Sequence, residues 1–181
     1  MKRALLFYSL IISTLLIGCN STNSNSGGFD EAIGRTAPDF TYTSLSGEQF
    51  TLSDFQGKVV YLFFYGAGCP HCRSNGPVTE SQINSTFEGN SSFMALGLDT
   101  WNSSASANNS FRSATNISYP LLLNAGQSLV DYYGNSSSYD RSVVIDASGK
   151  IAYQGSGFVN TDVENVVRTI ETELEKINTK N

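Results

Sequence analysis

A run of seven apolar or aromatic residues, Val59–Tyr65, constrains the fold of this chain more than any other feature, because polar residues do not alternate with apolar ones in it. A strand that is apolar on both faces belongs in the middle of a sheet covered on both sides. The run is followed by Gly66-Ala67-Gly68 and then by Cys69-Pro70-His71-Cys72. The order strand, tight loop, CxxC and helix is the context in which two cysteines one helical turn apart form a reversible disulfide.

The rest of the chain predicts alternating strands and helices around this run. We expect an N-terminal hairpin, then β, α, β, α, a further β-hairpin and a closing helix, which together indicate an α/β fold with a central mixed sheet. The predicted segments are 40–43 and 49–52 (hairpin), 58–65 (strand), 70–87 (helix kinked at Pro77), 93–98 (strand), about 102–116 (polar stretch opening a helix), 119–123 (extended), 127–133 (helix closed by Gly134), 143–146 and 151–153 (antiparallel strands), and 161–177 (helix).

The N-terminus is typical of a bacterial lipoprotein signal. Met1-Lys2-Arg3 is basic, and the 14 residues of Ala4–Ile17 carry no charge, which is short of the roughly 20 residues that span a bilayer. Leu16-Ile17-Gly18-Cys19 resembles a lipobox, so we expect residues 1–18 to be a signal peptide and Cys19 to carry lipid. The alternative is an ordinary secretory signal with an incidental cysteine.

Residues 19–28 then form the lipidated cysteine and a flexible polar tether, and residues 29–181 form one globular domain. Asn20, in place of Asp, favours the outer membrane, and we expect a lipid-anchored protein of the bacterial cell envelope that faces the periplasm. Without Lys2 and Arg3 the chain has 9 basic residues (11 less 2) against 16 acidic ones, a net charge of −7. No basic cluster is present, so nucleic acid is excluded as a partner.

The cysteine count fits an exported redox protein. Lipid on Cys19 leaves Cys69 and Cys72 as the one thiol pair of the chain. In an exported domain disulfides persist, so the redox state of this pair depends on dedicated partners. A backbone N–H and the positive dipole end at the helix start favour a thiolate on Cys69, which makes it the attacking cysteine. Cys72, one turn further along and more buried, would resolve the mixed disulfide.

The chain resembles the thioredoxin-fold redoxin superfamily, and most of all its exported TlpA/ResA-like thiol–disulfide oxidoreductases. The resemblance implies a thioredoxin-like three-layer fold with an N-terminal β-hairpin extension, no cofactor, and a monomer. It also implies that exported protein thiols or disulfides and a membrane redox partner react with the pair, and that Pro70 and His71 tune it. The resemblance rests on residues 37–40, 52–60, 69–72 with Pro77, 119–122, 133–134 and 144–151.

Three departures from the family pattern concern the site. Gly68 stands where the family usually has Trp, and Phe63 stands where many thioredoxins have a buried Asp. Asp99, at the end of the second buried strand, is therefore our candidate proton acceptor, with a strand-end or helix-capping role as the alternative. Asp140, followed by Arg141, stands at the family's cis-proline position, in a loop expected to face the cysteines. A cis bond without proline costs about 3 kcal/mol, so we expect a trans peptide or a locally different loop.

Other functions stay open at this point. Arg141 lies in a region shared with peroxiredoxins, but Leu62 and Gly66 replace the proline and hydroxyl residue of the peroxidase motif. A non-enzymatic protein could hold Cu(I) between Cys69 and Cys72. An inert disulfide is a further alternative. Structural zinc needs about four ligands, whereas His71 is the one histidine of the chain, so we expect no metal site.

Overall fold

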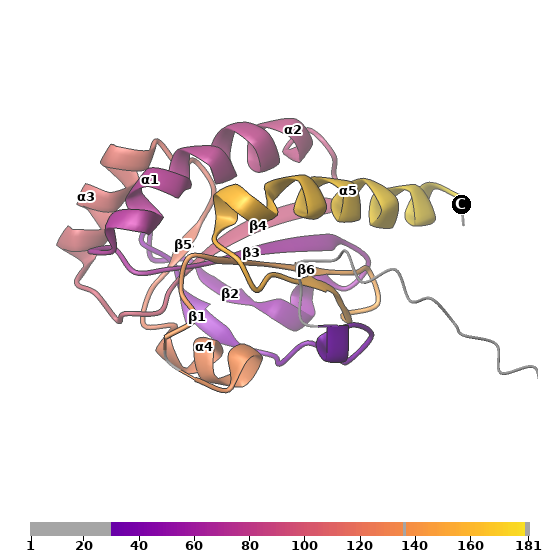
Figure 1. The fold of residues 1–181 in the computed structure, drawn as a ribbon, viewed down its shortest axis with the longest axis horizontal. Coiled ribbons are helices and arrows are strands. Elements are labelled where there is room, and N and C mark those ends of the chain that lie inside the picture. The colour runs from indigo at the N-terminus through magenta and orange to yellow at the C-terminus, as the bar shows by residue number, and fades with distance from the viewer. Residues whose placement is uncertain (1–29, 136, 180–181) are drawn as a thin grey trace, which may run out of the picture.

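The computed structural model describes residues 30–135 and 137–179 and shows a central five-stranded sheet between two layers (Figure 1). The strand order is β5-β4-β3-β6-β7, with β3, β4 and β5 parallel and β6 and β7 antiparallel to their neighbours. The strands are β3 (Val59–Tyr65), β4 (Phe93–Asp99), β5 (Leu121–Leu122), β6 (Arg141–Ile145) and β7 (Ile151–Gln154). The predicted α/β fold with a mixed central sheet is therefore confirmed.

Strand β3 lies in the middle of the sheet, and all seven of its residues are buried. Val59, Tyr61, Phe63 and Tyr65 enter one hydrophobic core, while Val60, Leu62 and Phe64 enter the other. Both sets are apolar, which is why the sequence shows no alternation here.

One core is covered by helices. They are α1 (Pro70–Val78), which continues through a π-helical segment η3 (Thr79–Asn84) into α2 (Ser85–Phe87), then α3 (Ala105–Thr115) and α5 (Val159–Asn178). Figure 1 shows these helices on one side of the sheet. The helix predicted over residues 70–87 is therefore present, and its change of winding directly follows Pro77. A proline inside a helix removes one backbone hydrogen bond, and a π turn accommodates such a break.

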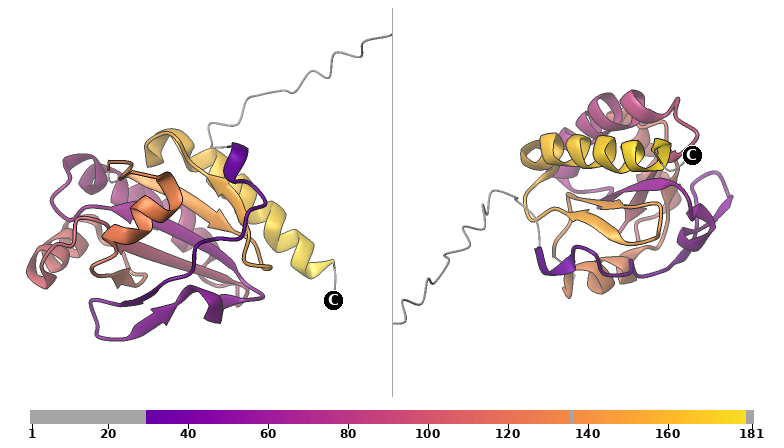
Figure 2. Two further views of the ribbon diagram at one scale, coloured as in Figure 1. Left: turned by 90° about the horizontal axis from the view of Figure 1, so that it is seen from below. Right: turned by 90° about the vertical axis from the view of Figure 1, so that its right-hand side faces the viewer.

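The other core is covered by α4 (Gly126–Tyr133) and by a separate two-stranded antiparallel sheet of β1 (Thr41–Thr43) and β2 (Gln49–Thr51). Short 3-10 turns, η1 (Asp30–Ala32) and η2 (Leu52–Phe55), flank this sheet. In the left view of Figure 2 these elements lie on the side of the sheet that faces the viewer. The predicted hairpin extension is thus confirmed, and Gly134 ends α4 with φ +68° as expected.

Element ends differ from the prediction by one to three residues. Helix α5 begins at Val159 instead of Thr161, because Phe158 is the last extended residue before it. Strand β6 begins at Arg141, two residues before the predicted 143, because Arg141 pairs with Phe64 of β3. No helix of the described part of the chain is long and apolar enough to cross a membrane. The predicted signal peptide (1–18), Cys19 and the tether to residue 28 lie outside the described residues.

Candidate functional site

Cys69 and Cys72 lie where β3 has left the sheet and α1 begins. The Cys69 N–H donates to the Gly66 carbonyl at 2.9 Å, which closes the tight loop between strand and helix. Cys69 is the N-cap residue of α1, and its sulfur accepts a hydrogen bond of 3.2 Å from the Cys72 N–H. Pro70 occupies the first turn of the helix, where a backbone N–H would have no partner within the helix, so the missing N–H of proline costs no hydrogen bond. The sulfur that must carry negative charge during exchange therefore faces a helix N-terminal donor.

Both cysteines are free thiols and both are buried. Cys69 is 1% exposed, but its neighbours Gly68, Pro70 and His71 are exposed. An incoming sulfur therefore reaches Cys69 over this short exposed rim.

The surroundings of the Cys72 thiol disfavour its ionised, thiolate form. Burial raises the pKa of Cys72, and so do the hydrogen bond with Cys69 and the charge of Asp140, while the Gly66 backbone lowers it. Cys72 thus keeps its proton at neutral pH, which fits a resolving cysteine that is deprotonated only when it attacks.

Asp140 comes from the loop before β6 and is fully buried. Its N–H donates to the Phe64 carbonyl at 2.7 Å, beside the end of β3 that leads to the cysteines. Its Oδ2 accepts a hydrogen bond of 2.6 Å from the Asn75 side chain of α1, whereas its Oδ1 is buried with no hydrogen-bond partner in the described part of the chain. Burial raises the pKa of this carboxyl, against the lowering effects of Asn75, Arg141 and His71.

The peptide bonds of the described residues are all trans, as predicted for the Asp140 loop. Asp140 has φ +58°, a left-handed conformation that Asp tolerates better than most residues. The loop therefore replaces the family's proline with a different backbone shape, and it turns a carboxyl group toward α1.

Arg141 and His71 both contact Phe158, which precedes α5. The Arg141 guanidinium carbon lies 4.9 Å from the centre of the Phe158 ring, and the His71 ring stacks on Phe158 at 4.9 Å with the planes 9° apart. Arg141 also donates to the Tyr139 and Asp140 carbonyls at 3.0 and 3.2 Å. These contacts place Arg141 beside the exposed rim of the site, with its own loop and Phe158 as partners.

Trp101 covers the loop before Cys69. A methyl group added to Gly66 would overlap the Trp101 ring, and one added to Gly68 would lie 3.4 Å from it. The Trp101 ring also packs edge-on against Tyr139 at 5.1 Å, and the residue is 43% exposed. Gly66 and Gly68 thus leave the space over this loop to the indole of Trp101, which comes from the loop after β4.

Asp99 ends β4 as predicted, and the structure shows that it is buried and that its carboxylate has several hydrogen-bond donors. It accepts from the Trp101 and Ser103 N–H groups, at 3.3 and 2.6 Å, from the Ser103 hydroxyl at 3.2 Å and from the Asn108 amide at 2.9 Å. These bonds hold the loop that leads into α3, so the geometry favours the capping role over proton transfer.

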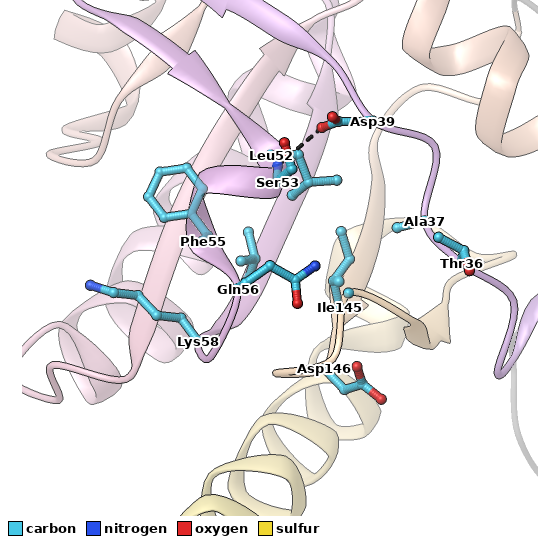
Figure 3. Close-up of a pocket in the computed structure, with 12 residues that line it drawn as sticks. Thr36, Ala37, Asp39, Leu52, Ser53, Phe55, Gln56, Lys58, Ile145 and Asp146 are labelled. Atoms are coloured by element: carbon cyan, nitrogen blue, oxygen red, sulfur yellow. Dashed lines mark hydrogen bonds between the residues drawn. The ribbon is translucent and has the colours of Figure 1, made fainter.

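A cavity of about 220 Å³ lies at the other end of the sheet (Figure 3). Val60 and Ile145, which pair with each other, both line it, whereas the cysteines follow the opposite end of β3. Ser53 donates its N–H to Asp39 at its rim, at 3.0 Å. In residues 30–135 and 137–179, no three His, Cys, Asp or Glu side chains gather as metal ligands would. The candidate functional site is therefore the cysteine pair and its surroundings.

Sequence analysis missed three residues of this site: Asn75, Trp101 and Phe158. Asn75 lies three residues after Cys72, so helical spacing alone places it on the same face of α1. Trp101 is the chain's one tryptophan and directly follows a buried strand, which is a usable signal. Phe158 meets His71 through the tertiary fold, and no local pattern predicts that contact.

Comparison with known proteins agrees with this geometry. The Redoxin family model matches residues 32–170. The chain is 28% identical over 181 residues to the thiol-disulfide oxidoreductase ResA of Bacillus thuringiensis subsp. konkukian, covering 98% of this chain and 99% of the relative. It is 29% identical over 118 residues to the thioredoxin-like protein YneN of Bacillus subtilis, covering 65% and 68%.

Solved structures agree as well. A Bacteroides thetaiotaomicron protein described as a protein disulfide isomerase is 31% identical, with a TM-score of 0.72, covering 83% of this chain and 94% of that one. A Chlorobium tepidum protein described as thiol:disulfide interchange protein DsbE is 26% identical, with a TM-score of 0.66, covering 78% and 97%. The predicted class of enzyme, a thiol–disulfide oxidoreductase, is thereby confirmed. The chain belongs to the redoxin family and has its thioredoxin-like fold.

Proposed function

We propose that this chain is a membrane-tethered oxidoreductase that exchanges disulfides with exported proteins through Cys69 and Cys72. The observation that carries the proposal is the position of Cys69 at the start of α1, with its sulfur bonded to the Cys72 N–H. That donor stabilises a thiolate on Cys69, so the reduced protein attacks a substrate disulfide through Cys69. In the reducing direction Cys72 then attacks the sulfur of Cys69 and releases the reduced substrate, so the two electrons pass from the cysteine pair to the substrate. In the oxidised protein a substrate thiolate attacks Cys69 of the Cys69–Cys72 disulfide, and Cys72 is the leaving thiolate.

The rim around Cys69 supports a role for His71 in tuning the pair. His71 directly precedes Cys72 and lies two residues after Cys69. Its ring stacks flat against the Phe158 ring. This fixed ring on the exposed rim around Cys69 is the basis for assigning His71 a tuning role. The tether proposed from Cys19 to residue 28 would keep this rim near a membrane, facing partners of the cell envelope.

The first test is to trap the mixed disulfide. In the full chain with Cys19→Ser, Cys69 and Cys72 are the remaining thiols. Adding Cys72→Ser should leave a stable mixed disulfide on Cys69 when the protein is mixed with a disulfide-bonded peptide, detected as a reducible mass increase. Adding Cys69→Ser instead should trap nothing. An unmodified Cys72→Ser protein would contradict the proposal.

The second test concerns the tether. The chain expressed in a bacterium that lipidates exported proteins should enter the membrane fraction and incorporate labelled fatty acid. With Cys19→Ala it should be found in the soluble envelope fraction without label. Unchanged membrane association of Cys19→Ala would show that another feature attaches the protein.

A further inference from the structure

We propose that Asp140 accepts the Cys72 proton during disulfide exchange, through its unpartnered oxygen Oδ1. The inference deepens the proposed function and rests on it, since it concerns the resolving step at the same cysteine pair. Neither Phe63, at the family's usual acidic position, nor Asp99 supplies this group: the first has no proton-accepting group, and the second has its carboxylate held by four donors.

Asp140 is aimed at the correct face of α1. Its Oδ2 is fixed by Asn75, one turn after Cys72, so the carboxyl group is held against the side of the helix that carries both residues. Cys72 is fully buried, and Asp140 is close enough to influence the charge of its sulfur. The second carboxyl oxygen, Oδ1, is buried and unpartnered in the described residues, which is a costly state for an ionised carboxylate.

Charge accounting favours transfer between these two groups. If the Cys72 proton went to water, the Cys72 thiolate and the Asp140 carboxylate would both be negative in the same buried space. Each negative charge disfavours the ionised form of the other group. If it goes to Asp140, the site holds one negative charge before and after the transfer. The two groups therefore titrate as a coupled pair that shares one proton.

The step balances as follows for a mixed disulfide between Cys69 and a substrate thiol. The proton of Cys72 moves to Oδ1 of Asp140, and the Cys72 thiolate attacks the sulfur of Cys69. The Cys69–Cys72 bond forms as the bond from Cys69 to the substrate breaks, and the substrate leaves as a thiolate. The proton on Asp140 then passes to that thiolate or to water. In the oxidising direction each movement is reversed, and Asp140 protonates Cys72 as it leaves.

Other charged groups around Asp140 must be separated from its effect. His71 and Cys72 lie on α1, Arg141 begins β6, and Tyr61 faces it from β3, while Asp162 of α5 acts on Tyr61. Burial raises the pKa of Tyr61 far above neutrality, so it stays protonated. His71, the one histidine of the chain, is therefore substituted separately in the test.

The test measures the resolving step by itself in the full chain with Cys19→Ser. The reduced protein is mixed with glutathione disulfide in a rapid-mixing instrument, and the first-order release of the second glutathione is followed from pH 5.5 to about 9, the range in which thiols ordinarily titrate. The wild-type rate should change little across neutral pH. With Asp140→Asn the rate at pH 7 should fall about 100-fold, the lower end of general-base effects, and rise about tenfold per pH unit.

Glu80→Gln is the matched control, because it removes a carboxylate two turns further along the same helix that binds Ser118 instead. It should keep the wild-type profile, and the Asp140→Asn effect should persist when His71→Asn is present. A resolving rate in Asp140→Asn within twofold of wild type at every pH would overturn the proposal. If the wild type itself never releases the second glutathione, the proposed function fails, whatever Asp140 does.

A measurement on the unsubstituted protein covers the case in which Asp140→Asn does not fold. Infrared difference spectra between the dithiol and disulfide forms should show a shift of a carboxylate band on oxidation, because the Cys72 proton lies beside Oδ1 in the dithiol form and has left the site in the disulfide form. A spectrum without any carboxyl change would overturn the proposal as well.

Discussion

At the scale of single residues, Gly66 and Trp101 depend on each other. Any side chain at Gly66 would occupy the space of the indole ring, so the loop before Cys69 and the loop after β4 close together only with glycine here. We expect Gly66→Ala to lower the free energy of unfolding by about 1–3 kcal/mol, the usual cost of overpacking, and to slow exchange at Cys69 by displacing the loop. Urea unfolding and the glutathione assay measure the two effects.

Gly89 is the matched control, because a methyl group added there meets no atom within 4 Å. Gly89→Ala should change stability by less than about 0.5 kcal/mol. If Trp101 is the cause, Trp101→Ala should remove most of the additional cost of Gly66→Ala in the double variant, so that the two effects are strongly non-additive. Additive effects would show that Gly66 is needed for another reason.

Single residues also mark the limit of sequence reasoning at the site. The CxxC pair could be predicted because strand, loop and helix are all local, and the trans peptide at Asp140 followed from the missing proline. The burial of the Asp140 carboxyl could not be predicted. It depends on Asn75, which lies 65 positions away in sequence. It also depends on the left-handed backbone of Asp140, a conformation that an aspartate can adopt but that its presence in a sequence does not predict.

At the scale of elements, Asp99 joins β4 to α3. Its carboxylate binds two backbone N–H groups of the connecting loop and the Asn108 side chain within α3, and the Asn108 carbonyl in turn accepts from Tyr65 at 2.6 Å. We expect Asp99→Ala to lower the free energy of unfolding by about 2–4 kcal/mol, because it leaves buried donors without partners. Chemical unfolding of the reduced protein measures this.

Asp99→Asn should restore part of that stability, because its amide oxygen still accepts from the loop. If Asp99 were instead the proton acceptor, Asp99→Asn would alter the pH profile of the resolving step as strongly as Asp140→Asn. Its stability and its pH profile, measured side by side, thus distinguish the two roles of Asp99.

Element prediction succeeded where apolar residues either fill a segment continuously or recur at helical spacing. β3 is buried on both faces, and α5 places Val163, Val166, Ile170 and Leu174 on one buried stripe, so both were predicted nearly to the residue. β5 is only Leu121–Leu122, although residues 119–123 were predicted to be extended, because only these two pair with β4. A local segment shows which of its residues are apolar, but it does not show which residues of another strand they will pair with.

At the scale of the whole molecule, two of the buried carboxyl groups belong to Asp140, in the loop before β6, and to Asp162 of α5. Asp140 is fully buried, and Asp162 of α5 is 4% exposed, with the Gly157 N–H donating to its Oδ2 at 3.2 Å. Burial raises the pKa of both groups above the ordinary value. Stability at neutral pH is therefore lower than the packing of the core alone would give, which is a common cost of a buried reactive site.

The sign of the resulting pH dependence follows from proton binding. Above the ordinary Asp pKa of about 3.9, and up to the raised values, the folded protein binds more protons than the unfolded chain. The free energy of unfolding contributed by these two groups therefore falls as pH rises through that window and is largest below it. We expect the difference in unfolding free energy between wild type and Asp140→Asn/Asp162→Asn to grow in favour of wild type as pH is lowered from 7 toward 4.5.

Urea unfolding of the reduced proteins at several pH values measures this difference directly, and using the difference cancels the titration of the other carboxylates. Glu80→Gln is again the control, since the Glu80 carboxylate has hydrogen-bond donors and its removal should not produce the same slope. A difference that is independent of pH would mean that Asp140 and Asp162 ionise alike in the folded and unfolded chain. The buried site would then carry both charges at no cost, and the coupling of Asp140 to the Cys72 proton would lose its physical basis.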